Sequence, residues 1–194
     1  SCSSSTTSAI DGNNTITFNT LSDGTYSDCK ITVTDSLGNA VTLNISSFIV
    51  DTTRPTVSSV SPTDNSTDVS VSTAVAVTFS ETMSTSTITT NTDNTTCSGS
   101  FRLSSDNFTT CIRMSAAPSA SNSDKTFTTT PADNLSRGTT YKLQITTSVT
   151  DTSSNSLASA YTTTNGFTTY GTGTIKGIVR YDNNTAADNV SVSF

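Results

Sequence analysis

The sequence has no histidine, no tryptophan and a single glutamate, Glu81. Imidazole is the usual general base, zinc ligand and activator of a serine or cysteine nucleophile, so its absence excludes catalytic triads, zinc hydrolysis and histidine proton relays. Charged residues make up only 12% of the chain, the net charge is −6, and the nine Lys and Arg are scattered. This balance argues against nucleic acid or an anionic membrane as a partner. We expect a protein that is not an enzyme.

Long apolar stretches are also absent. No run of about 18 apolar residues is available for a membrane-spanning helix. The N-terminus lacks the basic and apolar regions of a signal peptide. We therefore expect no direct membrane insertion, and we expect any targeting segment to have been removed or to lie outside this chain.

Apolar residues are few but regularly spaced. Leu, Ile, Val and Phe total 38 of 194 residues, close to the level where disorder begins, although the low charge opposes disorder. Many alternate with polar residues, the period of half-buried strands, and the 44 threonines fit the solvated faces of such strands. The pattern predicts an all-β protein, with alternation at Ile31 and Val33; Val41, Leu43 and Ile45; Val75, Val77 and Phe79; Tyr141, Leu143 and Ile145; and Val190, Val192 and Phe194.

Four cysteines fall into two separated sets, Cys2 with Cys29 and Cys97 with Cys111. Neither set has CxxC spacing or a nearby histidine, so disulfides are favoured over metal or redox chemistry. Residues 98–114 are predicted to form a hairpin whose turn would bring the second pair within bonding range. Disulfides need oxidising surroundings, which predicts an extracellular or cell-surface location.

The first segment, residues 1–51, is predicted to hold strands near 15–21, 25–34 and 41–50. Three strands are too few for a sandwich of about seven. The segment nevertheless resembles the second half of bacterial Ig-like repeats, which occur in tandem in large surface proteins. The resemblance rests on the motifs DGTY at 23–26, TDSLGN at 34–39 and the linker VDTTRP at 50–55.

Residues 52–170 resemble a complete Ig-like domain of the type named after a bacterial S-layer protein. The resemblance implies a sandwich of about seven strands and a structural or adhesive role. One departure is an insertion from Thr85 to Ser123 that carries the cysteine hairpin, and its Ser/Thr/Asn-rich lead-in is expected to be a mobile or ligand-facing loop. The matching motifs lie in order at 55–57, 61–65, 68–71, 77–83, 127–131, 135–141, 149–151 and 166–168.

The tail, residues 171–194, resembles the first two strands of carboxypeptidase-regulatory-like or Cna-B-like sandwiches. Two strands alone cannot bury their apolar face. In Cna-B-type domains a lysine can form an isopeptide bond, but that bond needs a buried acid beside it. Because the only glutamate lies in the middle segment, solvated side chains are favoured for Lys30 and Lys176.

Calcium is the most plausible cofactor, because Asp and Asn oxygens at turns and linkers are its ligands. Asp35, Asn39 and Asp51 form one candidate group, and Asp151 with Asn155 is a weaker echo of it. A hydrogen-bonded turn is the favoured alternative, since no dense D-x-D-x-D run is present. Glycan binding stays open, although the chain has five Tyr and no Trp for it.

These patterns predict tandem Ig-like β-sandwiches, with a partial domain at 1–51, a complete one at 52–170 and opening strands at 171–194. The first hypothesis is a structural or adhesive extracellular protein of a fibre, adhesin stalk or S-layer, self-associating head to tail by strand complementation. The alternative is a calcium-dependent ligand- or glycan-binding module. Equally open is a piece of a longer tandem array that needs no complementation. The predicted assembly residues are Ile175, Val179, Val190, Val192 and Phe194.

Overall fold

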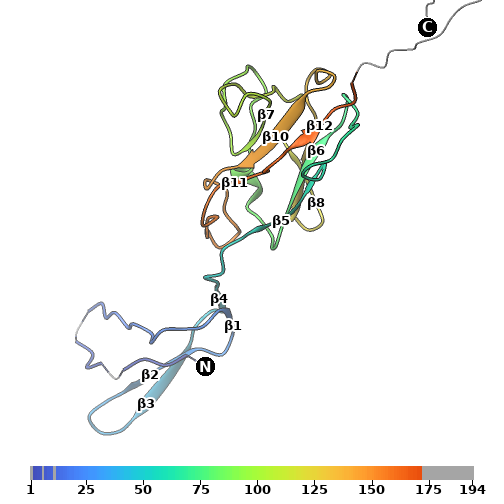
Figure 1. Cartoon of the computed structure of the whole chain (residues 1–194). Coiled ribbons are helices and arrows are strands. Elements are labelled where there is room, and N and C mark those ends of the chain that lie inside the picture. The colour runs from blue at the N-terminus through green and yellow to red at the C-terminus, as the bar shows by residue number, and fades with distance from the viewer. Residues whose placement is uncertain (1, 6, 11, 172–194) are drawn as a thin grey trace, which may run out of the picture.

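The structure, a computed structural model, describes residues 2–171 except 6 and 11. It confirms the all-β, Ig-like class: the described residues form twelve strands and one 3₁₀ turn, η1 (Thr85–Thr87). No helix among them is long and apolar enough to cross a bilayer. Figure 1 shows a larger unit with β5 to β12, called here the middle unit, and a smaller N-terminal unit with β1 to β4.

Two sheets make up the middle unit. In the first, the strand order is β5-β6-β9-β8, and in the second β10 pairs with β11 and β12 along one edge and with β7 along the other. All these pairings are antiparallel. The strands are β5 (Val57–Ser61), β6 (Val75–Phe79), β7 (Phe101–Ser104), β8 (Ser119–Ser121), β9 (Thr126–Thr129), β10 (Thr140–Ile145), β11 (Tyr161–Thr162) and β12 (Phe167–Thr168).

The core lies between the two sheets and follows the predicted alternation. On β6, Val75, Val77 and Phe79 are buried and the residues between them are half-buried. On β10 the buried residues are Tyr141, Leu143 and Ile145. Each such side chain contributes about 1.5–3 kcal/mol when it leaves water, so this core is what stabilises the unit.

The insertion differs from the prediction. Residues 101–104 do not form a hairpin with 108–114, because β7 pairs instead with β10, Leu103 opposite Leu143. Phe101, Leu103 and Met114 are fully buried and belong to the core cluster. The insertion therefore supplies a strand of the second sheet and is not a mobile loop along its whole length.

The N-terminal unit consists of two separate two-stranded sheets, β1 with β4 and β2 with β3. Two of the predicted strands are each split in two, and near 15–21 there is only a single bridge, between Ser4 and Phe18. Cys29 is the only buried residue between positions 2 and 50 that the structure describes. The strands are β1 (Gly24–Tyr26), β2 (Lys30–Thr34), β3 (Ala40–Asn44) and β4 (Phe48–Val50).

The alternation in this unit predicts strands correctly but not burial. Val33 and Val41 face each other across β2 and β3, yet they are 56% and 73% exposed. The physical reason is that no second sheet covers this face in the part of the chain described. The predicted assembly residues of the tail lie outside the described residues.

Candidate functional site

The linker after β4 is tied to the N-terminal unit by Asp23. Its carboxylate accepts hydrogen bonds from the Thr52 amide at 3.0 Å and from the hydroxyls of Thr52 and Thr53, each at 2.8 Å. The Thr52 hydroxyl, followed by that of Thr53, lowers the pKa of Asp23 below its ordinary value. The carboxylate is thus held ionised as an acceptor for the linker.

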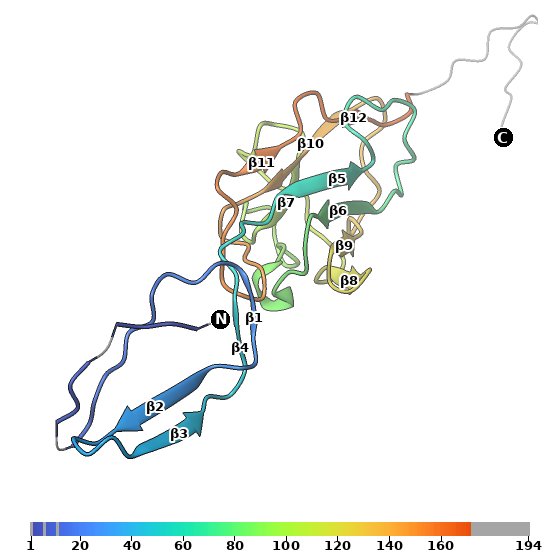
Figure 2. The same cartoon turned by 90° about the horizontal axis from the view of Figure 1, so that it is seen from below.

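The linker is also tied to the middle unit. The Asn155 side-chain amide donates to the carbonyl of Asp51 at 3.0 Å, and the Arg54 guanidinium donates to the carbonyl of Ser156 at 3.1 Å. These two bonds join residues more than 100 positions apart in the sequence. They fix the path of the chain between the units (Figure 2).

Asp35 and Asn39 form a five-residue turn between β2 and β3. Asp35 Oδ1 accepts the amides of Leu37 and Asn39 at 2.9 and 2.8 Å, and its Oδ2 accepts the Asn39 side-chain amide at 2.8 Å. These bonds, the Asn39 side chain first, lower the pKa of Asp35. Gly38 closes the turn with φ 88°, which other residues adopt only with strain.

The loop at 151–155 repeats this turn bond for bond. Asp151 Oδ1 accepts the amides of Ser153 and Asn155, each at 2.8 Å, and Oδ2 accepts the Asn155 side-chain amide at 2.9 Å. Ser154 takes the place of Gly38, at φ 73°. The shared sequence pattern, an Asp followed four positions later by an Asn, therefore corresponds to a shared hydrogen-bonded turn. This is the alternative to a calcium site that the sequence favoured.

Asp51 does not join Asp35 and Asn39, so the first predicted calcium group is not brought together. The turn between β2 and β3 lies at the end of that hairpin remote from β4, which Asp51 follows (Figure 1). Asp51 instead meets Asp151 and Glu81, and their carboxylate oxygens lie within 4.8 Å of one another. We call these three residues the acidic junction.

Glu81 is the member of the acidic junction that sequence reasoning missed. Burial raises its pKa, and the negative charges of Asp151 and Asp51 raise it further, while Lys125 acts in the opposite direction. Carboxylates in such a group can share a proton or hold a hard cation such as calcium. Asp151 already uses both of its oxygens as hydrogen-bond acceptors, which limits what it offers a cation.

The raised pKa predicts a pH dependence. A carboxyl whose pKa is higher in the folded state stabilises the fold below its unfolded pKa of about 4.5, and loses that contribution as the pH rises through the folded pKa. Glu81→Gln should remove this loss and stabilise the middle unit at pH 7 by about 0.5–1 kcal/mol, given screening by solvent.

Denaturant unfolding between pH 4 and 8 measures this effect. Asp93→Asn, which removes an exposed charge outside the acidic junction, is the control and should change little. Equal pH profiles for Glu81→Gln and the parent chain would contradict the prediction.

A calcium titration of the melting temperature tests whether the acidic junction binds a cation. A rise in melting temperature with millimolar calcium that Glu81→Gln abolishes would show that a cation binds at this junction.

A stacked aromatic pair occurs at the same register in both units. Tyr26 on β1 pairs with Phe48 on β4, with ring centroids 5.4 Å apart, and Tyr141 on β10 pairs with Phe167 on β12, at 5.8 Å. The middle-unit pair is buried, at 3% exposed each, whereas Tyr26 and Phe48 are only half-buried. The two units thus share this pair and its register, but the pair is buried only in the middle unit.

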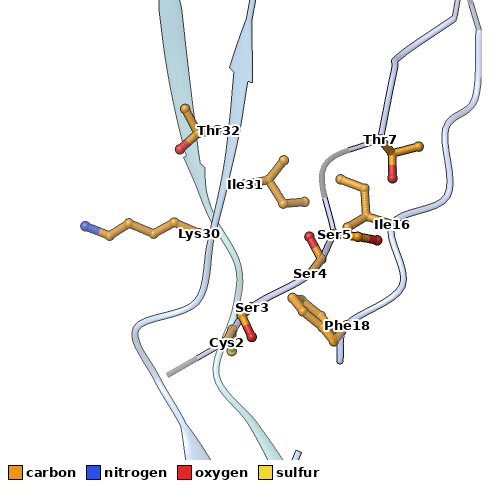
Figure 3. A pocket seen from close by; sticks show the side chains of 10 residues that line it. All are labelled: Cys2, Ser3, Ser4, Ser5, Thr7, Ile16, Phe18, Lys30, Ile31 and Thr32. Carbon is orange, nitrogen blue, oxygen red and sulfur yellow. The ribbon is translucent and has the colours of Figure 1, made fainter. Parts of the chain in front are cut away.

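A cavity of about 210 Å³ lies on the side of β2 that faces residues 2–18. Figure 3 shows Ile31 pointing from β2 toward Ile16 and Phe18 on the opposite wall, while Lys30 points away. The rest of the lining is Ser and Thr together with Cys2.

Both predicted cysteine pairs are bonded in the structure. The Cα atoms of Cys2 and Cys29 are 5.4 Å apart and those of Cys97 and Cys111 are 4.9 Å apart. The first bond attaches the N-terminal segment to Cys29, the residue before β2. The second bond closes a loop within the insertion. No free cysteine is found in the described residues.

The chain belongs to the bacterial Ig-like domain family, whose model matches residues 51–169. Among solved structures, it is similar to domains 1–6 of the surface layer protein SbsC, with 23% identity and a TM-score of 0.43, over 68% of this chain and 16% of that one. The N-terminal part of the S-layer protein SbsC gives 23% identity and the same TM-score, over 66% of this chain and 26% of that one. The chain thus spans a minor part of these proteins. Curated protein sequences gave no match.

Proposed function

We propose that the chain is a non-enzymatic structural segment of an extracellular surface assembly, in which Ig-like units joined by fixed linkers associate head to tail. Membership of the bacterial Ig-like family and the two disulfides support a surface location. The structural relatives are described as surface layer proteins.

One observation carries the assembly part of the proposal: the uncovered face of the N-terminal unit. The large exposed aliphatic side chains of the described residues all lie between Ile10 and Ile49. Such a concentration of exposed apolar side chains in one unit favours a contact site there. They are Ile10, Ile16, Val33, Leu37, Val41, Leu43 and Ile49.

The tail of a neighbouring copy supplies apolar side chains for this face. Burial of each aliphatic or aromatic side chain contributes about 1.5–3 kcal/mol. The five predicted assembly residues together therefore offset a large share of the estimated 4–15 kcal/mol that association costs. Ile175, Val179, Val190, Val192 and Phe194 are those residues.

Sedimentation velocity over a range of concentrations, with electron microscopy of the same samples, tests the proposal. The full chain should form concentration-dependent oligomers or filaments, and a chain that ends at Gly171 should stay monomeric. A chain with Val190→Ser, Val192→Ser and Phe194→Ser keeps the tail's length and should also stay monomeric. A full chain that is monomeric at high concentration, or a shortened chain that assembles equally well, would exclude head-to-tail assembly.

The alternative function, a calcium-dependent ligand- or glycan-binding module, has one supporting feature, the acidic junction. The insertion that was expected to meet a ligand is instead partly buried in the core. Calorimetry with a glycan panel in the presence of calcium separates the two functions, because a structural segment should give no heat of binding.

A further inference from the structure

The middle unit shows how a closing strand of this fold is covered. β12 pairs with β10 on one edge. The segment Ser66–Val69 lies along the other edge and forms a single parallel bridge, from Val69 to Thr169. The Val69 amide donates to the carbonyl of Thr168 at 3.1 Å, and the Tyr170 amide donates to the carbonyl of Val69 at 3.0 Å. Thr168 also donates to the carbonyl of Ser66 at 2.8 Å. Both edges of β12 are therefore satisfied.

β4 is the counterpart of β12 in the N-terminal unit. Because Phe48 pairs with Tyr26 as Phe167 pairs with Tyr141, Ile49 stands where Thr168 does and Asp51 stands where Tyr170 does. Val50 stands where Thr169 does, and the Thr169 amide donates to the carbonyl of Thr139 at 3.1 Å. Because bonded positions alternate in an antiparallel pair, the amide and carbonyl of Ile49 face away from β1. Outside the β1–β4 ladder, no backbone bond reaches Ile49 or the amide of Asp51 in the described part of the chain. The Ile49 side chain is 70% exposed. β4 therefore presents an open edge at the place where β12 is closed.

The tail carries a sequence like the one that closes β12. Val69-Ser70-Val71-Ser72 recurs letter for letter as Val190-Ser191-Val192-Ser193. Val69 follows Asp51 by 18 positions, and Val190 follows Tyr170, the counterpart of Asp51, by 20. In both places an alternating apolar segment comes first, β5 in the middle unit and residues 175–181 in the tail. The tail sequence thus repeats the order of segments that opens the middle unit.

The position of Gly171 favours a second copy as the partner of residues 175–181. The linker to the N-terminal unit meets the middle unit at the 151–155 turn, beyond the end of β10, whereas Gly171 lies against Gly138, just before β10 begins. Figure 1 shows these two places at opposite ends of the middle unit. β10 alone spans about 20 Å, but only about 14 Å of chain can separate Gly171 from Ile175. A segment that begins at Ile175 therefore cannot take, beside its own N-terminal unit, the place that β5 takes beside the linker in the middle unit; it can do so only on another copy.

We propose that the segment around Val190 of one copy adds in parallel to the open edge of β4 of the next copy, as the segment Ser66–Val69 adds to β12 within the middle unit. This rests on the proposed head-to-tail function and assigns its acceptor strand. The linker that precedes the tail then reaches the Asp35–Asn39 turn of the next copy, as the Asp51 linker reaches the Asp151–Asn155 turn. Such addition of a strand from another chain is a known mode of recognition.

A pair of proline substitutions tests the acceptor strand. Ile49→Pro removes the open amide of β4 and leaves the bonds of Phe48 and Val50 to β1 in place. Thr25→Pro, opposite Ile49 on β1, removes an amide that points away from β4 and is the matched control. Sedimentation of the full chain should show at least about a tenfold weaker association for Ile49→Pro, and no change for Thr25→Pro.

Mixing two chains that each keep only one side of the proposed contact gives a second measurement. Ile49→Pro keeps its tail, and a chain that ends at Gly171 keeps its β4 edge. Each alone should be monomeric, and together they should form a one-to-one pair that does not grow further. Hydrogen exchange of the unsubstituted full chain needs no variant: the Ile49 amide should exchange about tenfold more slowly once the chain assembles, while the Thr25 amide should not change.

The outcomes separate the two proposals. If the full chain never assembles, the proposed function fails. If it assembles and Ile49→Pro assembles equally well, the proposed function stands and the β4 edge is not the acceptor. If the Ile49 amide is protected at every concentration while the chain stays monomeric, the tail folds back on its own molecule and the inter-copy contact is wrong.

Discussion

Phe101→Ala is expected to destabilise the middle unit by about 3–5 kcal/mol, the usual cost of removing a buried aromatic ring. Phe101 is fully buried and begins β7, where it pairs with Ile145 on β10. The surrounding core side chains belong to strands that are held in both sheets, so they cannot collapse into the space left behind. Chemical denaturation monitored by tyrosine fluorescence measures the change.

Phe108→Ala is the matched control for this prediction. Phe108 lies in the same insertion and is only half-buried. Its loss should cost about 1 kcal/mol or less, in line with the smaller area it removes from water. A similar small loss for Phe101→Ala would mean that the insertion packs loosely and that β7 is not part of the core.

The central strands could be predicted from the sequence, and β7 could not. On β6 and β10 three apolar residues recur two apart, which is a sufficient signal of a half-buried strand. β7 offers only Phe101 and Leu103 within a long polar segment, and its partner Leu143 is about 40 positions away. Pairing at that distance depends on the tertiary fold, so local reasoning favoured a hairpin closed by the cysteines.

Burial in the N-terminal unit was also beyond local reasoning. The alternation at Val33 and Val41 is the same whether or not a second sheet is present, because period-2 spacing reports only that one face is apolar. What covers that face is decided by other strands. An exposed apolar face on a correctly predicted strand therefore points to a partner.

The acidic junction could be predicted only in part. The shared pattern of an Asp followed four positions later by Asn predicts the two turns, and their hydrogen bonds match. The meeting of Asp51 with Asp151 joins residues 100 positions apart, which no spacing rule predicts. Glu81 lies two residues after the end of the buried strand β6 and is the only glutamate in the sequence, and these are the two signals that could have drawn attention to it.

Removing the disulfide of the insertion is the second change with a large expected effect. Cys97→Ser with Cys111→Ser opens a loop of 14 residues' separation, which should cost about 3 kcal/mol if the bond acts by restricting the unfolded chain. Cys111 is also 1% exposed, so the serine hydroxyl there enters a buried position and adds to the loss. Thermal unfolding of the middle unit measures the total.

Hydrogen exchange should show where the order is lost. Residues 95–99 and 105–111 should exchange faster, because besides the disulfide the two segments are linked by the backbone hydrogen bond that the Cys111 amide donates to the carbonyl of Thr95 at 2.8 Å. Phe101 and Leu103 should stay protected, since β10 holds β7 independently of the cysteines. Cys2→Ser with Cys29→Ser is the control and should leave the melting of the middle unit unchanged, because that bond lies in the N-terminal unit. Unchanged exchange across residues 95–111 would mean that hydrogen bonds alone order this segment in the folded state. The disulfide would then change stability only by restricting the unfolded chain.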